Sequence, residues 1–304
     1  MEVNLISDTV TRPNSGMLKA MMGAAVGDDV FKEDPTVNEL ETEVARLFGM
    51  ESALFFPSGT MANQTGIKLH TEPGDQLICD KYAHVYNYEG GGVSFNSGVS
   101  CRLVDGNRGM MTAGQVEQAI NPPDFYHSPK TALVCIENTT NKGGGACWDF
   151  QELQEIKKVC DRHQLRYHLD GARIWNALAS TPEGPEAYGA LFDTISVCLS
   201  KGLGCPVGSL LLGSEQSMEK ALRIRKVLGG GMRQAGYLAA AGLYALEHNR
   251  GRLAEDHRRA KEIGAELQNR DFVTFVAPVE TNIVIVEVEP PFERQSTAES
   301  PATR

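Results

Sequence analysis

Asp170 and Lys201 are two side chains whose types and spacing could do chemistry together. Asp170 ends the strand-like run LRYHLD, and Lys201 follows the next strong strand candidate, residues 193–200. The carboxyl ends of strands are where open α/β sheets gather their ligands. A lysine amine and a carboxylate in one crevice suit pyridoxal phosphate, since the amine binds its aldehyde and the carboxylate keeps its ring nitrogen protonated. A structural ion pair, or a lysine reaching from a strand end to water, explains the same spacing.

A second candidate is the turn PSGT at residues 57–60, between a strand-like run and a helix-like one. The N–H groups of Gly59 and Thr60 would point outward at a helix N-terminus, where anions bind. Glycine permits close approach to the backbone, and the Thr60 hydroxyl adds a donor. Turns of this kind are also common in α/β proteins as plain connections.

Four further side chains are weaker candidates. His84 lies in KYAHVYNYEGGG and could stack on a flat ring, or be a half-buried loop residue. His127 precedes a strand and by itself reads as exposed. Arg173, three residues beyond Asp170, could hold a carboxylate through two hydrogen bonds or pair with a surface acid. Arg233 follows three glycines in GGGMRQAG, which could approach a phosphate, contact a partner subunit or form a flexible entry to a helix.

The elements that must position these residues alternate along the chain. Helices are predicted at residues 36–49, with Thr36 and Glu39 in capping-box spacing, at 61–70 after the PSGT turn, and at 149–164, capped by Asp149. Strands are predicted at residues 53–56, 75–80, 99–104, 131–137, 165–170, 193–200 and 209–213. Alternating strands and helices predict an α/β fold with a mostly parallel sheet.

The pattern changes near Tyr237 to one long helical stretch, residues 236–270, and one strand-like run, residues 281–289. We therefore predict a large domain over residues 1–245 and a partial small α+β domain over 246–304, with a disordered tail from about residue 290. A single strand after a helix makes this second unit look unfinished.

Composition narrows the class of protein. The chain has 304 residues, a net charge of −10 and 41% hydrophobic residues, which argues for a globular protein and against nucleic acid or an anionic membrane as partner. Seven scattered cysteines without CxxC spacing indicate reduced thiols, and the sequence MEVNLISDTV shows no secretory signal. We expect a cytoplasmic location and no metal site.

Together these segments resemble the low-specificity L-threonine aldolases, a family of pyridoxal-phosphate enzymes with the aspartate-aminotransferase type of fold (fold type I). The resemblance covers most of residues 4–260, in the family's order. The matching stretches are SDTVTRP, MMGAAVGDDVFKEDPTVNELE, FFPSGTMAN, AHVYNYEGGG, IENT, HLDGARIWNA, CLSKGLGCPVGSLL, GGGMRQAG and LAEDH.

The resemblance implies a role for each cofactor residue. Lys201 would bind the cofactor's aldehyde, Asp170 would pair with the pyridinium nitrogen and His84 would stack on the ring. Ser58, Gly59 and Thr60 would form the phosphate site.

It also implies how substrate is held. Ser7 and Arg173 would bind the substrate carboxylate, with Arg173 also bordering the cofactor. His127 matches a histidine near the β-hydroxyl, so the base would be His127, His84 or a water. Arg233 would reach a cofactor site across a subunit contact. The implied reaction cleaves L-threonine or L-allo-threonine to glycine and acetaldehyde, in a dimer or tetramer.

Three departures from the family's pattern leave alternatives open. Ile6 stands where the family has arginine before SDT, and Thr140 replaces the histidine of ENTHN. The family also continues beyond TNIVIVEVE with a segment that supplies another arginine. A non-catalytic or weakly active shortened isoform is therefore one alternative, and another lyase or racemase reaction on β-hydroxy amino acids is a second.

Overall fold

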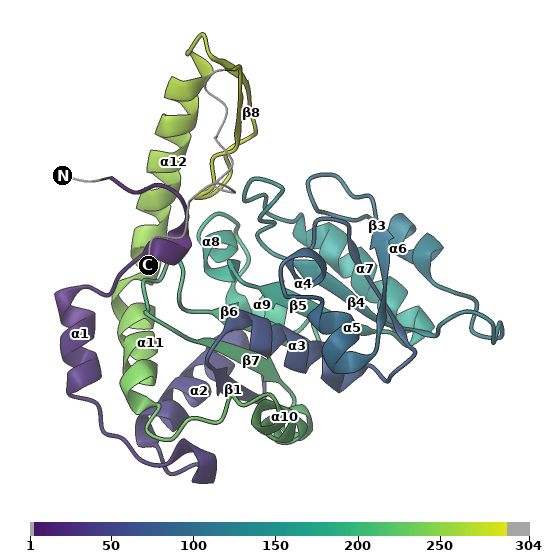
Figure 1. The fold of residues 1–304 in the computed structure, drawn as a ribbon, viewed down its shortest axis with the longest axis horizontal. Helices are drawn as coiled ribbons and strands as arrows, with labels where there is room; N and C mark the ends of the chain where they lie inside the picture. Colours follow the sequence, from purple (N-terminus) through teal and green to yellow (C-terminus); the bar gives the residue numbers. More distant parts are fainter. Residues whose placement is uncertain (1–2, 291–304) are drawn as a thin grey trace, which may run out of the picture.

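A seven-stranded sheet forms the larger part of the molecule in the computed structural model, which describes residues 3–290 (Figure 1). The strand order is β1-β7-β6-β5-β4-β2-β3, and only β7 runs antiparallel to its neighbours. The mostly parallel α/β sheet predicted from the sequence is confirmed. The strands are β1 (Ser52–Phe56), β2 (Gln76–Asp80), β3 (Ser100–Val104), β4 (Thr131–Glu137), β5 (Arg166–Gly171), β6 (Thr194–Cys198) and β7 (Ser209–Gly213).

Helices cover both faces of this sheet, so its central strands are apolar on both sides. In β4, Leu133 and Cys135 pack in one apolar cluster, whereas Val134 and Ile136 pack in the other. The helices are α1 (Ser15–Met22), α2 (Pro35–Phe48), α3 (Gly59–His70), α4 (His84–Asn87), α5 (Gly92–Ser97), α6 (Ala113–Ala119), α7 (Phe150–His163), α8 (Ile174–Leu178), α9 (Pro185–Gly189), α10 (Glu215–Val227), α11 (Gly236–His248) and α12 (Leu253–Gln268). Short 3-10 turns lie at Asp8–Val10, Asp29–Phe31 and Arg250–Arg252.

Of two predicted helix starts, one is wrong and one is confirmed. The N-cap of α2 is Asp34, whose Oδ1 accepts from the N–H groups of Thr36 and Val37, both at 3.1 Å. The predicted capping box at Thr36 is wrong, because Pro35 fits the first helical position, where no N–H is needed. Asp149 does cap α7, and its side chain accepts from the N–H of Gln151 at 2.9 Å.

The C-terminal helical stretch is not continuous. It breaks into α11 and α12 at Asn249, whose side chain donates to the carbonyl of Leu203 at 2.7 Å. The predicted strand at 281–289 shortens to β9 (Val286–Val288), which pairs with a strand not predicted, β8 (Val273–Val276). Figure 1 shows α12 and this two-stranded sheet standing away from the large sheet.

A domain boundary near residue 245 remains a proposal. Most of the predicted tail lies outside the described residues. Among residues 3–290, no helix has both the length and the apolar content needed to cross a lipid bilayer.

Candidate active site

The candidate site lies at the carboxyl ends of the parallel strands. Asp170 is the last residue but one of β5, and Lys201 follows β6 in a tight turn. Two hydrogen bonds fix the carbonyl of Lys201, one from the N–H of Gly204 and one from the Thr11 hydroxyl, both at 2.8 Å. Gly204 has φ +79°, a left-handed conformation that favours glycine. The N-terminal segment and this glycine turn together place Lys201 beside the sheet.

The Asp170 carboxylate is buried and only partly satisfied. Its Oδ1 accepts from the N–H of Ala172 at 3.1 Å, while Oδ2 has no hydrogen-bond partner among residues 3–290. Burial, followed by the negative charge of Glu89, raises the pKa of Asp170, and the charges of His84 and Lys201 oppose that shift. A buried acceptor without a partner is rare. It fits the protonated ring nitrogen of pyridoxal phosphate.

His84 lies against this carboxylate at the start of α4. Each of His84, Glu89 and Asp170 has a ring nitrogen or carboxylate oxygen that lies within 4.8 Å of such an atom in the other two. The N–H of His84 donates to Glu137 Oε2 at 2.9 Å, and its Nδ1 lies 3.0 Å from Glu89 Oε1. The hydrogen bond with Glu89 raises the pKa of His84, against the effect of burial. The structure therefore brings two predicted residues, Asp170 and His84, together, and the charge of Lys201 acts on the same carboxylate.

Arg173 is engaged by Asp8 from the N-terminal segment. Its Nε donates to Asp8 Oδ2 at 2.9 Å and its Nη2 donates to Oδ1 at 2.8 Å. Asn282 of the C-terminal unit donates to Oδ2 at 3.1 Å. Burial alone would raise the pKa of Asp8, but the hydrogen bonds and charge of Arg173 hold it below the usual value. Ser7, the adjacent residue, caps the Asp8–Val10 turn, so it lies beside this pair.

The PSGT turn forms the N-terminus of α3 as predicted. Ser58 is the N-cap and accepts from the N–H of Met61 at 3.2 Å. A side chain at Gly59 would meet only the Ser209 hydroxyl, at 3.4 Å, and that buried hydroxyl has no partner among the described residues. Gly59 and Thr60 thus stand at a helix N-terminus beside an unused polar group, which fits a phosphate.

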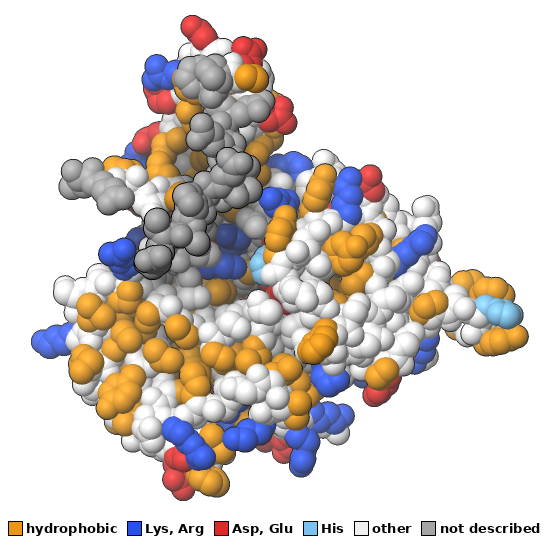
Figure 2. Space-filling model, in the orientation of Figure 1, with side chains coloured by type: hydrophobic (Ala, Val, Ile, Leu, Met, Phe, Trp, Pro, Cys, Tyr) orange, Lys and Arg blue, Asp and Glu red, His pale blue; other side chains and the backbone are white. Residues whose placement is uncertain are grey.

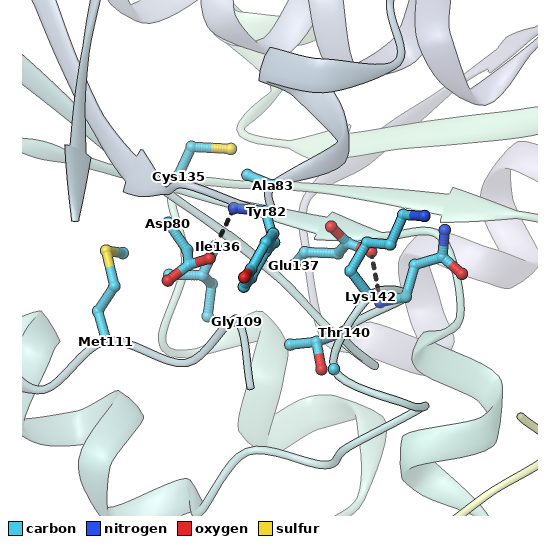
Figure 3. A pocket seen from close by; sticks show the side chains of 12 residues that line it. Asp80, Tyr82, Ala83, Gly109, Met111, Cys135, Ile136, Glu137, Thr140 and Lys142 are labelled. Carbon is cyan, nitrogen blue, oxygen red and sulfur yellow. Dashed lines mark hydrogen bonds between the residues drawn. The ribbon is translucent and has the colours of Figure 1, made fainter. Parts of the chain in front are cut away.

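A narrow cavity lies beside the site and shares Glu137, the acceptor of the His84 N–H, with it. Figure 3 shows its lining, including the carboxylates of Asp80 and Glu137 and the side chain of Thr140. Burial, then the charge of Asp170, raises the pKa of Glu137 to about 7. The Thr140 hydroxyl, at the position of the family's histidine, is buried and has no partner in the described part of the chain.

Two predicted residues lie outside this cluster. His127 is exposed in the loop between α6 and β4, with its ring 4.1 Å from that of Tyr126. Arg233 pairs with Asp28 at 2.6 Å in the segment before α11. Among residues 3–290, no hydrogen bond or ion pair joins either of them to Asp170, His84 or Lys201.

Five polar residues of the site were not predicted: Asp8, Glu89, Glu137, Ser209 and Asn282. Asp8 and Glu137 lie in the motifs SDTV and IENT, so the sequence indicates that they are near the site. It does not indicate which residues they contact. Glu89 also lies in a matching stretch, five residues after His84. Ser209 and Asn282 reach the site only through tertiary packing, which single-sequence periodicity does not report.

These features define a class of protein: an α/β fold with a lysine, an unpaired carboxylate and a helix N-terminus at one edge of the sheet. Figure 2 shows basic, acidic and histidine side chains meeting in a hollow beside the C-terminal unit. The arrangement suits a phosphorylated aldehyde with a basic aromatic ring.

Comparison with known proteins gives the family. The chain belongs to the beta-eliminating lyase family, whose model matches residues 4–290. It is 42% identical over 293 residues to low-specificity L-threonine aldolase 1 of Arabidopsis thaliana, covering 94% of this chain and 81% of that protein. It is 42% identical over 294 residues to the low specificity L-threonine aldolase of Escherichia coli K12, covering 94% and 84%. The Leishmania major threonine aldolase structure shares the fold, with a TM-score of 0.80 at 21% identity over 93% of this chain and 83% of that one.

Proposed function

We propose that this protein is a pyridoxal-phosphate-dependent aldolase that cleaves L-threonine or L-allo-threonine to glycine and acetaldehyde. The observation that carries the proposal is the unpartnered Oδ2 of buried Asp170, next to His84 and within the electrostatic reach of Lys201. The relatives at about 40% identity carry the name of this reaction.

The cofactor, when bound, supplies an electron sink that takes up the bonding pair released as the Cα–Cβ bond breaks. Lys201 would hold its aldehyde carbon, Asp170 its ring nitrogen, and Ser58, Gly59 and Thr60 its phosphate. Nothing else is consumed: the hydroxyl proton leaves oxygen as acetaldehyde forms, and a proton returns to Cα to give glycine.

The chain's own side chains orient the substrate. Arg173 and Ser7 would bind the carboxylate, which sets the Cα–Cβ bond relative to the ring plane. His84 is the base that this chain itself brings to the site, and it would accept the β-hydroxyl proton directly or through a water. Orientation by these groups converts a mobile substrate into one poised for bond cleavage.

A homo-oligomer, dimer or tetramer, is part of the proposal, as is a cytoplasmic location. Figure 2 shows apolar side chains gathered over the face formed by α1 and α11. Leu18 and Met22 of α1 are 49% and 81% exposed, and Tyr237 of α11 is 43% exposed. A contiguous apolar surface of this kind is typical of subunit contacts. Assembly could also bring His127 or Arg233 to a neighbouring site.

Product analysis tests the proposed reaction. Purified protein with pyridoxal phosphate and L-threonine should release acetaldehyde and glycine in equal amounts, and Lys201→Ala should release neither. The same assay distinguishes the other lyase or racemase reactions that the fold could host. A 2-oxo acid with ammonia, or D-allo-threonine (the product of inversion at Cα) without acetaldehyde, would overturn the aldolase assignment.

A further inference from the structure

A chain of hydrogen bonds crosses the buried face of the sheet beneath α3 and ends at the candidate site. His70 Nε2 lies 2.9 Å from the Thr194 hydroxyl, which lies 2.8 Å from His168 Nδ1. His168 Nε2 lies 3.3 Å from Asn63 Oδ1, and Asn63 Nδ2 donates to Glu89 Oε1 at 3.0 Å. The four inner members are nearly or fully buried, with Glu89 the most exposed at 6%.

The chemistry of Glu89 fixes the direction of every bond in this chain. A carboxylate only accepts, so the amide nitrogen of Asn63 faces Glu89 and the amide oxygen faces His168. His168 must then donate from Nε2. Burial lowers the pKa of His168 to about 3, so the ring is neutral and its Nδ1 accepts from the Thr194 hydroxyl.

The outer end follows by the same logic. The Thr194 hydroxyl donates its proton to His168 Nδ1, so the hydroxyl oxygen of Thr194 accepts from the Nε2–H group of His70. Burial lowers the pKa of His70 to about 4, so this ring is neutral too. All dipoles therefore point toward Glu89, an arrangement in which each hydrogen bond strengthens the next.

Glu89 collects three donors at the inner end. Gln64 Nε2 donates to its Oε2 at 2.6 Å, and Oε1 faces Asn63 Nδ2 and His84 Nδ1, each at 3.0 Å. With its side chain fully buried, Glu89 has no freedom to rotate away. His84 must therefore place its proton on Nδ1, which leaves Nε2 of the neutral ring as its acceptor.

We propose that Glu89 is a positioning residue that fixes the tautomer and ring orientation of His84, and that the buried chain from His70 through Asn63 holds Glu89 in place. The chain orients; it does not conduct protons, because the Asn63 amide cannot pass a net proton from His168 to Glu89. The inference rests on the proposed function only where it makes His84 Nε2 the acceptor of the substrate's proton. The tautomers of His84 and His168 do not depend on the proposed function.

Packing gives independent support for this chain. A Cβ added at Gly66 of α3 would lie 2.7 Å from Cε1 of His168. The glycine lets the helix approach closely enough for the imidazole to reach Asn63 one turn earlier. Gly66 is thus explained by the buried chain and not by a turn.

Nitrogen NMR of histidine-labelled protein, with and without pyridoxal phosphate, tests the proposal. We expect His84 protonated on Nδ1 at neutral pH, with Nε2 acting as an acceptor when the ring is neutral, and we expect His168 protonated on Nε2 alone.

Glu89→Gln should abolish the strongly hydrogen-bonded Nδ1–H signal and lower the pKa of His84. It should also reduce kcat roughly tenfold with little change in KM, comparable to losing an orienting partner of a ligating histidine. The matched control is Glu117→Gln, which alters the exposed pair with His163 and should change none of these quantities.

The outcomes separate this inference from the proposed function. A neutral His84 protonated on Nε2 in the unaltered protein would overturn it, whether or not Glu89→Gln folds. A wild-type kcat in folded Glu89→Gln, with threonine cleavage intact, would overturn it as well. The predicted tautomers in a protein that releases no acetaldehyde would support the positioning role and reject the aldolase assignment.

Discussion

Arg173 and Asp8 form a two-point ion pair that joins the end of β5 to the N-terminal segment, with N–O distances of 2.9 and 2.8 Å. Their side chains are 8% and 9% exposed. The pair uses Nε and Nη2 of the guanidinium and leaves Nη1 for a substrate carboxylate. Asp8 thus sets the plane in which Arg173 would bind substrate.

Replacing Asp8 should destabilise the fold. Asp8→Ala leaves the buried Arg173 charge without its partner, which typically costs about 3–5 kcal/mol. Urea unfolding followed by circular dichroism measures the loss. As a control, Glu262→Ala removes one exposed partner of Arg258 and should cost less than about 1 kcal/mol. Equal effects of the two variants would contradict the role assigned to the buried pair.

Glu137 should make stability depend on pH. Burial raises its pKa from 4.5 to about 7, so folding takes up a proton between these values. Between these two pH values Glu137 ionises more readily in the unfolded chain than in the folded one, which favours unfolding. The contribution of Glu137 to the free energy of unfolding should therefore fall as pH rises from about 4.5 to 7, and stay constant above pH 7. Glu137→Gln should remove this fall when unfolding free energies are compared with those of the wild type across the same range. Parallel curves for the two proteins would show that Glu137 ionises normally.

Gly66 should not tolerate a side chain. Gly66→Ala places a methyl group 2.7 Å from the His168 ring, and such overpacking costs about 1–3 kcal/mol. Gly114→Ala is the matched control in α6, where the nearest atom to a new Cβ is 4.0 Å away. It should be neutral or stabilising by up to about 1 kcal/mol. Thermal unfolding of both variants measures the contrast, and a Gly66→Ala protein as stable as the control would argue against the close packing of α3.

Gly59 tests the phosphate site without disturbing the core. A Cβ there finds its nearest neighbour at 3.4 Å, so Gly59→Ala should fold normally. The methyl group would lie where a phosphate approaches the helix N-terminus, and we expect cofactor affinity to fall about tenfold, or about 1.4 kcal/mol. Absorbance titration gives the dissociation constants. An unchanged dissociation constant would show that the cofactor phosphate does not bind at the N-terminus of α3.

Much of the fold could be predicted because its signals are local. The parallel strands are short apolar runs, and β4 and β7 match their predicted bounds to the residue. The break at Asn249 and the strand β8 were missed because each depends on tertiary contacts: the former on a hydrogen bond to Leu203, the latter on pairing with β9. Partly exposed residues in β8 give no period-two pattern to detect.

The site was predictable where a residue lies close to the end of a strand, as Asp170 and Lys201 do, or opens a helix, as Gly59 does. The ion pairs and hydrogen bonds that set the charges of the site could not be predicted from the sequence. The sequence places Arg173 near the crevice, but its partner Asp8 lies 165 residues away in the chain. Glu89 is close to His84 in sequence, yet its role depends on Asn63 and His168, which only the packing of α3 on β5 brings within reach.

The role of Lys201 as the residue that binds the cofactor is tested most directly by the visible absorbance spectrum of the purified chain, recorded after pyridoxal phosphate is added and the excess is removed. We expect a band of lysine-bound cofactor in the wild type and in Lys142→Ala, a control at an exposed lysine that lines the neighbouring cavity. The band should be absent in Lys201→Ala. A chain that retains no cofactor, or a band that persists in Lys201→Ala, would contradict the assignment of Lys201 and Asp170 as the centre of the site.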